Sequence, residues 1–184
     1  MLTVDTLNVT VGDLQRNYLF KVMVPVLPTA LPTVLPDALT IANNMDVYVE
    51  KLPNPESSNK PIGFKWSGEQ VWYSGPNDAP MTVVLSLRCD RTWAAHKFFK
   101  FWKDLGGSDA TQAAFPKPMT LGQMDLLTVD VDKTTVLHAT ELHKVQIFKV
   151  GQQEYDKGGD AEVKFDVTIH FERKIERYDN LGTV

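Results

Sequence analysis

The stretch VKFDVTIHFER, residues 163–173, decides the fold class of this chain. Apolar and polar residues alternate along it, which is the period of a strand with one face in a core and the other in water. The apolar set is Val163, Phe165, Val167, Ile169 and Phe171, and the polar set is Glu162, Lys164, Asp166, Thr168, His170 and Glu172. The alternation spans 161–174 and, at about 3.4 Å per residue, predicts a strand that is more than about 30 Å long. A mainly β, antiparallel architecture is therefore expected.

Further strands precede this one, each rich in β-branched and aromatic residues and bounded by turn residues. Residues 135–150 predict a strand that contains a bulge, joined to the closing strand by a long hairpin loop over 151–160. Earlier strands are expected over 17–26, 45–51, 64–73 and 82–89. The last two resemble a hairpin with a long loop, because breaker residues fill 74–78. Residues 119–133 fit either a short helix or an irregular strand.

One flanking α-helix is predicted over about 91–105, RTWAAHKFFKFWKDL. Asp90 is a suitable N-cap, and Gly106-Gly107 supplies the C-terminal stop. The helical period predicts an apolar stripe made of Ala94, Phe98, Phe101, Trp102 and Leu105. The core candidates of the whole chain are Phe20, Phe98, Phe101, Trp102, Phe165, Val167 and Ile169. Lys97, Lys100 and Lys103 lie largely on other faces, which suit either solvent or a partner.

Two turn-rich stretches interrupt the strand pattern. In residues 27–42, prolines recur at Pro28, Pro32 and Pro36, which favours a semi-extended loop over a helix. Residues 52–62 predict a second, projecting loop. Both stretches carry apolar residues that would be costly to leave in water, so we expect them to pack on something. The contact candidates are Leu31, Val34, Leu35, Tyr48, Leu52 and Ile62.

Composition excludes several classes of protein. The 184 residues are 43% hydrophobic and carry a net charge of −4, which suits one domain over 1–184 and disfavours affinity for nucleic-acid phosphates. The apolar runs are far shorter than the roughly 20 residues that cross a bilayer, so no membrane segment is expected. The first residues do not have the pattern of a secretory signal. Cys89 is the single cysteine, which excludes an internal disulfide and favours a packing role.

No motif indicates catalysis. His96, His138, His143 and His170 lack metal-ligand spacing, and neither phosphate-binding glycine motif occurs. No nucleophile elbow is present, so neither an enzymatic activity nor a cofactor or metal is expected. Carboxylates gather in two groups that fit either solvated faces or an acidic site for a ligand or calcium. They are Asp125, Asp130 and Asp132, and Glu154, Asp156, Asp160, Glu162 and Asp166.

The order of these features resembles the tail-tube protein family of contractile-tailed bacteriophages, shared with the inner tubes of phage-like contractile injection systems. The matching segments are RNYLFKVMV with Asn17, Leu19 and Phe20, then Trp72-Tyr73, then MTVVLSLRCD and the aromatic helix, and finally the strand pair 145–150 and 163–171. Residues 27–42, 52–62 and the tail beyond Arg173 depart from the family pattern. These departures leave open a tube-initiator or baseplate ring of the same fold.

The resemblance implies a β-sandwich or barrel that assembles into hexameric rings, which stack head to tail into the inner tube of a virion tail. It implies partners in the sheath, baseplate and tail terminator, assembly in the bacterial host cytoplasm, and DNA, or an effector, as the translocated cargo. Carboxylates on the channel wall would repel DNA over a short range. The lumen candidates are Glu162, Asp166, His170, Asp130 and Asp132, with an outward orientation as the alternative. The helix face with Lys97, Lys100 and Lys103 would then meet the sheath.

Two rival functions belong to other classes. A monomeric β-barrel that binds a small ligand would need an interior pocket. A hydrolase with dispersed catalytic residues would need perturbed titratable groups gathered in a cleft.

Overall fold

The computed structural model describes residues 20–53, 55, 59–66, 69–77, 81–108, 114–130, 135–151 and 163–178. Strands and helices occur in successive groups along these residues, and α5 is the longest helix among them. The elements are β1 (Phe20–Val26), α2 (Leu31–Val34), α3 (Ala38–Asn43), α4 (Met45–Tyr48), β2 (Val49–Lys51), β3 (Asn59–Trp66), β4 (Glu69–Asn77), β5 (Thr82–Arg88), α5 (Ala94–Gly106), α6 (Lys117–Thr120), β6 (Gly122–Val129), β7 (Val136–Val150), β8 (Lys164–His170) and β9 (Arg173–Tyr178).

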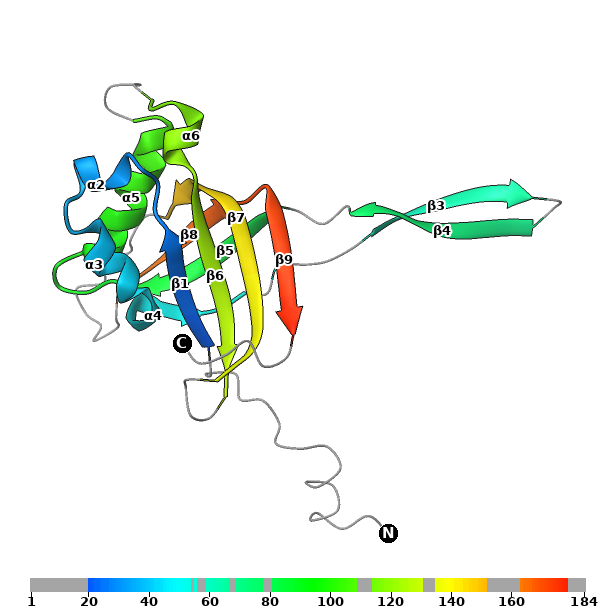
Figure 1. Cartoon of the computed structure of the whole chain (residues 1–184), viewed down its shortest axis with the longest axis horizontal. Helices are drawn as coiled ribbons and strands as arrows, with labels where there is room; N and C mark the ends of the chain where they lie inside the picture. Colours follow the sequence, from blue (N-terminus) through cyan, green and yellow to red (C-terminus); the bar gives the residue numbers. More distant parts are fainter. Residues whose placement is uncertain are drawn as a thin grey trace, which may run out of the picture.

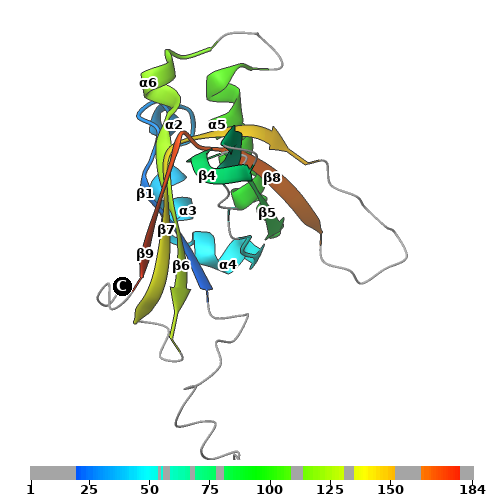
Figure 2. The same cartoon turned by 90° about the vertical axis from the view of Figure 1, so that its right-hand side faces the viewer.

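A curled antiparallel sheet forms the body of the molecule. Its strand order is β1-β6-β7-β8-β5-β2, and β9 also pairs with β7. Strand β7 therefore belongs to two layers. The front layer is β1-β6-β7-β9, and the back layer is β7-β8-β5-β2, whose strands cross behind the front ones (Figures 1 and 2). The expectation of a mainly β, antiparallel fold is confirmed, in the form of a half-barrel.

The closing strand is not the single long strand that the alternation predicted. β8 and β9 both run antiparallel to β7, and the register is the same on the two sides of the break at Phe171 and Glu172 that separates them. Opposite this break β7 has a bulge at Lys144, whose φ of 54° is the left-handed conformation. The predicted bulge is thus present. It bends the paired ribbon from the back layer into the front layer, because a bulge increases the local twist.

Helix α5 covers the core between the two layers. It starts at Ala94 rather than at residue 91, since Trp93 has a left-handed φ of 62°. The N-cap residue is therefore Trp93 and not Asp90, but Asp90 Oδ1 still accepts the backbone N–H of Ala94, at 2.9 Å. Its buried residues are Ala95, Phe98, Phe99, Trp102 and Leu105. The core also takes in Phe165, Val167 and Ile169, while Phe20 is half-buried against it.

Phe101 is a correction to the predicted core. Its side chain is 38% exposed, and Phe99, which the sequence pattern left out, is fully buried in its place. The two residues lie on different faces of α5, and the buried face includes the adjacent pair Phe98 and Phe99. In a run of three aromatic residues among four positions, the 3.6-residue period does not by itself determine which ones face the core.

The proline-rich stretch is helical, which is a second correction. Pro32 lies in the first turn of α2, where a missing N–H costs nothing. α2 and α3 pack against α5, and Leu31 is fully buried in the core instead of forming an intermolecular contact. Met45 is also fully buried, on α4, so only Val49–Lys51 of the predicted strand 45–51 is β.

β3 and β4 form a separate two-stranded hairpin, which we call the arm. The predicted single strand over 64–73 is wrong, since Trp66 ends β3 and pairs in antiparallel orientation with Glu69, which begins β4. The predicted pairing of 64–73 with 82–89 is wrong too, because β5 pairs with β2 and β8. The arm projects from the side of the body that carries β9, whereas the helices lie on the side that carries β1 (Figure 1).

Candidate assembly surfaces

The front layer has polar side chains on the face turned away from the core. Arg177 from β9 binds Glu141 on β7 through two nitrogens, at 2.9 and 3.2 Å. Beside them, Gln123 Nε2 donates to Asp125 Oδ1 at 3.0 Å, and His143 Nε2 lies 3.4 Å from Glu141 Oε2. Burial raises the pKa of Asp125 above its ordinary value, and the Glu141 carboxylate opposite acts in the same direction. This face therefore carries a polar cluster in which Glu141 is ion-paired with Arg177 and Asp125 is hydrogen-bonded to Gln123.

A small apolar cluster lies beside these polar side chains on the same face of the front layer. Because side chains alternate along a strand, the residues of this cluster point to the same side of the layer as Asp125 and Glu141. The cluster consists of Leu127, Val129, Val136 and Ala139, with Met23 packed against it. This layer thus buries apolar side chains on both of its faces.

The two outer strands of the front layer are candidate assembly edges. Among the described residues, β1 pairs only with β6, and β9 pairs only with β7. Each strand thus presents one edge without a strand neighbour, and such edges readily pair with another chain. Counting along the antiparallel layer, β1 and β9 run in opposite directions.

A cluster of charges holds the corner where the layers meet. Glu172, at the break between β8 and β9, pairs with Lys117 and Lys144, each at 2.7 Å. Hydrogen bonds from these two lysines lower the pKa of Glu172 to about 2. The partners are 55 and 28 residues away in the sequence, so no local pattern could have revealed the cluster.

The outer face of the back layer carries two of the lumen candidates. Asp166 on β8 is exposed and accepts a hydrogen bond from Ser86 Oγ at 2.6 Å. His170 is half-buried and stacks on Phe148, with ring centroids 4.9 Å apart. Asp130 is exposed at the end of β6, well away from both. The two remaining candidates, Glu162 and Asp132, lie outside the described residues.

The helical side of the body exposes apolar and basic groups. Leu39 on α3 is 62% exposed, and Val34 on α2 and Phe101 on α5 are each 38% exposed. We call these three residues the helical patch. Lys97 and Lys100 are exposed on α5, while Lys103 is half-buried beside Asp104. Of the other contact candidates, Leu35, Tyr48 and Leu52 pack partly buried against the core, and Ile62 on the arm is 48% exposed.

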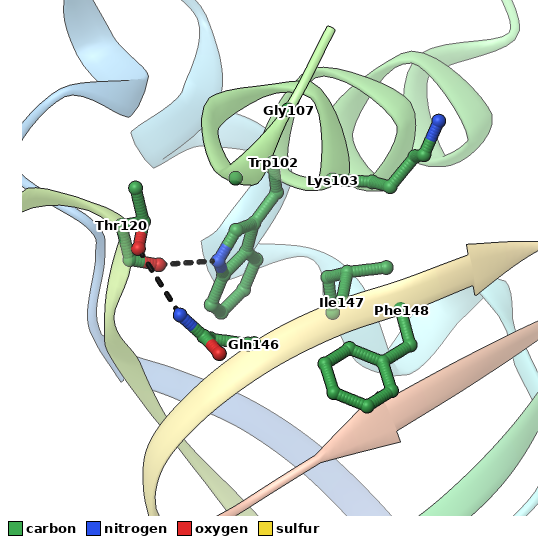
Figure 3. Close-up of a pocket in the computed structure, with 8 residues that line it drawn as sticks. Trp102, Lys103, Gly107, Thr120, Gln146, Ile147 and Phe148 are labelled. Atoms are coloured by element: carbon green, nitrogen blue, oxygen red, sulfur yellow. Dashed lines mark hydrogen bonds between the residues drawn. The ribbon is translucent and has the colours of Figure 1, made fainter. Parts of the chain in front are cut away.

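A pocket of 270 Å³ opens at the C-terminal end of α5 (Figure 3). Its polar groups are already engaged, because Trp102 Nε1 donates to the Thr120 carbonyl at 3.0 Å and Gln146 Nε2 donates to Thr120 Oγ1 at 3.3 Å. Its lining residues are Trp102, Lys103, Gly106, Gly107, Thr120, Gln146, Ile147 and Phe148. None of these is a histidine, cysteine or carboxylate.

A metal site, a reactive thiol or imidazole, and a membrane span each have requirements with which the described part of the chain can be compared. There, no group of histidine, cysteine and carboxylate residues is arranged to hold a metal ion. Burial raises the pKa of the Cys89 thiol and lowers the pKa of His96. None of the described helices combines the length and apolarity that a membrane span requires.

The fold matches solved structures of contractile machines. A chain of the extended sheath–tube complex of an extracellular contractile injection system, PVC, aligns with a TM-score of 0.59 at 10% identity, over 97% of this chain and 99% of that one. The tube terminating cap of the anti-feeding prophage, AFP, aligns with a TM-score of 0.55 at 13% identity, over 92% and 98%. The PVC sheath/tube terminator aligns with a TM-score of 0.53 at 10% identity, over 91% and 99%.

The sequence matches no protein-family model and no curated protein. Because the aligned structures share so few identical residues with this chain, the likeness lies in the fold. The resemblance to contractile tail-tube proteins is confirmed at that level.

Proposed function

We propose that the chain is a structural subunit of the inner tube of a contractile machine, in which copies form rings and rings stack head to tail. The observation that carries the proposal is the front layer with its two unpaired edges, within a fold shared with chains of tube complexes and tube caps. The role requires no catalysis. Residues 1–184 would form one tail-tube domain.

Ring closure follows from the direction of the strands. A rotation about an axis that runs roughly along the strands leaves their direction unchanged, so β9 of one copy would meet β1 of the next in antiparallel orientation. This contact is heterologous and generates a ring when the rotation closes. The resemblance to tail-tube proteins implies six copies in the ring. Closing the ring would remove both exposed edges, as a barrel does.

The channel would be lined by the outward face of the front layer. The back layer and the helices lie on the other face of this layer (Figure 2), and only the outside of a closed ring has room for them. The wall would then carry Asp125 and Glu141 together with Lys21, Arg173 and Arg177. Asp166 and His170 would lie outside the channel, so the wall would be of mixed charge rather than acidic.

The sheath, baseplate and terminator are the expected partners, in keeping with a tail or tail-like particle. The basic side of α5, with Lys97, Lys100 and Lys103, would be on the outside of the ring and available to a sheath. The three structures described above are named as parts of injection systems or of a prophage, which favours an injection tube over a DNA-conducting virion tail. A tube-initiator or baseplate ring of the same fold is the alternative role.

Negative-stain electron microscopy of the purified chain, together with its mass in solution, tests the proposal. Hollow rings or tubes are the expected result. A particle that stays at the monomer mass of 20.7 kDa at high concentration, with no ring in the images, would contradict it and favour a monomeric ligand-binding barrel.

A further inference from the structure

The two strands of the arm have no strand partner outside the arm among the described residues. β3 and β4 pair with each other, and neither strand pairs with another described element. An isolated two-stranded hairpin is marginally stable in water at best. The arm would therefore be stabilised by packing against another surface.

The register of the arm gathers its apolar residues at alternate positions. Ile62 pairs with Tyr73, and Phe64 pairs with Val71. Alternate residues of a strand, and their direct partners on the neighbouring strand, belong to the same face of the ribbon. One face of the arm therefore combines aliphatic and aromatic positions, and Ile62 is 48% exposed there.

The arm points to the place that a neighbouring copy would occupy. It leaves the body on the β9 side and lies at the height of α3 and α5 (Figure 1). Viewed from the side, it lies at the depth of α5, behind the front layer (Figure 2). Its eight-residue strand β3 reaches about 26 Å at about 3.3 Å per residue.

A copy whose β1 pairs with this β9 would bring its own helices to the arm. Its helices α2, α3 and α5 lie on the β1 side and pack against one another. They carry the helical patch, Val34, Leu39 and Phe101, which the body leaves exposed. In the described part of the chain, the arm pairs with no further strand and the helical patch is exposed, and the two lie on opposite sides of the molecule.

We propose that the apolar face of the arm packs on the helical patch of the next copy in the ring and clasps adjacent subunits together outside the channel. The occupant of the patch is a second copy of this chain. The inference rests on the proposed tube function, because the ring contact between β9 and β1 brings the two surfaces together.

Cross-linking between copies tests the clasp. In a Cys89→Ser background, one preparation carries Ile62→Cys and another carries Leu39→Cys. We expect the mixture, but neither preparation alone, to form a covalent dimer under mild oxidation. A chain with both cysteines should give a ladder that stops at the size of the ring. Val84→Cys, exposed on β5 in the back layer, is the matched control partner and should not cross-link with Ile62→Cys.

Substitutions provide an independent readout. Leu39→Asp should abolish assembly at the wild-type concentration and leave the thermal midpoint of the monomer unchanged, whereas Thr40→Asp, at the next exposed position of α3, should assemble normally. Rings in which Ile62 cross-links with neither Leu39 nor Phe101 would overturn the clasp and leave the tube proposal standing. A chain that forms neither rings nor cross-links would count against both.

Discussion

The body and the arm of this molecule are held together in different ways. In the body, each layer packs on a core whose largest members, Trp102 and Phe98, are essentially inaccessible to water. In the arm, two strands pair only with each other among the described residues. Since hydrophobic burial supplies most of the free energy of folding, the body can fold by itself, whereas the arm depends on what it meets.

This difference separates stability from assembly within one chain. The surfaces that we propose for contact between copies are the arm, the helical patch and the edges of β1 and β9, and the core of the body contains none of them. Substitutions in the core of the body should therefore change the free energy of unfolding. Substitutions in the arm or in the helical patch should change assembly instead.

The largest expected effect is on the body. Trp102→Ala removes a fully buried indole and its hydrogen bond to the Thr120 carbonyl, and should lower the free energy of unfolding by about 3–5 kcal/mol. Phe101→Ala, one residue earlier on α5, is the matched control and should cost less than about 1 kcal/mol, because its ring is partly in water. Urea denaturation of both variants measures the difference. Equal losses would contradict the assignment of the two faces of α5.

A smaller loss of stability is expected from a substitution at Gly122, where β6 lies close to α5. A Cβ atom at Gly122 would lie 2.7 Å from Trp102 Cζ2 and 2.8 Å from the Val26 carbonyl oxygen. Gly122→Ala should therefore destabilise the body by about 1–3 kcal/mol, since the backbone oxygen cannot move without disturbing β1. Gly106→Ala is the control, because no heavy atom lies within 4 Å of its Cβ position. A neutral Gly122→Ala in thermal denaturation would show that the contact relaxes freely.

The sequence predicts the body well wherever one face of an element is buried. The alternation around Val167 and the aromatic run of α5 follow directly from hydrophobic burial, and both elements occur in the fold. Phe101 marks the limit of this reasoning, because several aromatic residues in a row satisfy more than one helical face. Proline spacing was misleading at Pro32, since the first turn of a helix accommodates proline as well as a loop does.

The candidate surfaces are harder to predict because they depend on contacts that are distant in sequence. The bend of the closing ribbon at Glu172 depends on a bulge at Lys144, and its ion pairs span 28 and 55 residues. Strand propensity predicts one strand over 64–73, where the structure has the end of β3 and the start of β4. The Ser67-Gly68 dipeptide in the middle of that stretch is a turn signal.

The corner of the body should show a moderate, pH-dependent effect. The folded pKa of Glu172 is lowered to about 2 from an ordinary value of 4.5, so its stabilising contribution is complete above pH 4.5 and is lost as the pH falls towards 2. Glu172→Gln should therefore be less stable than the wild type at pH 7, and the difference should disappear between pH 4.5 and pH 2. Urea denaturation across this range measures it. In a Lys117→Met, Lys144→Met background the same substitution should have little effect, and a full effect there would rule out the ion pairs as its cause.

Removal of the whole arm should have the smallest effect on the free energy of unfolding of the monomer. Replacing residues 59–77 with Gly-Ser-Gly-Ser removes the arm and keeps Pro55, whose carbonyl accepts a hydrogen bond from Lys174 Nζ at 3.1 Å. The free energy of unfolding should change by less than about 1 kcal/mol, because the arm adds no strand pairing to the body and a shorter loop costs slightly less entropy to close. Urea denaturation at low protein concentration measures the body, and electron microscopy at high concentration measures the loss of rings. A large loss of monomer stability would mean that the arm folds as part of the body, and the separation of stability from assembly would then fail.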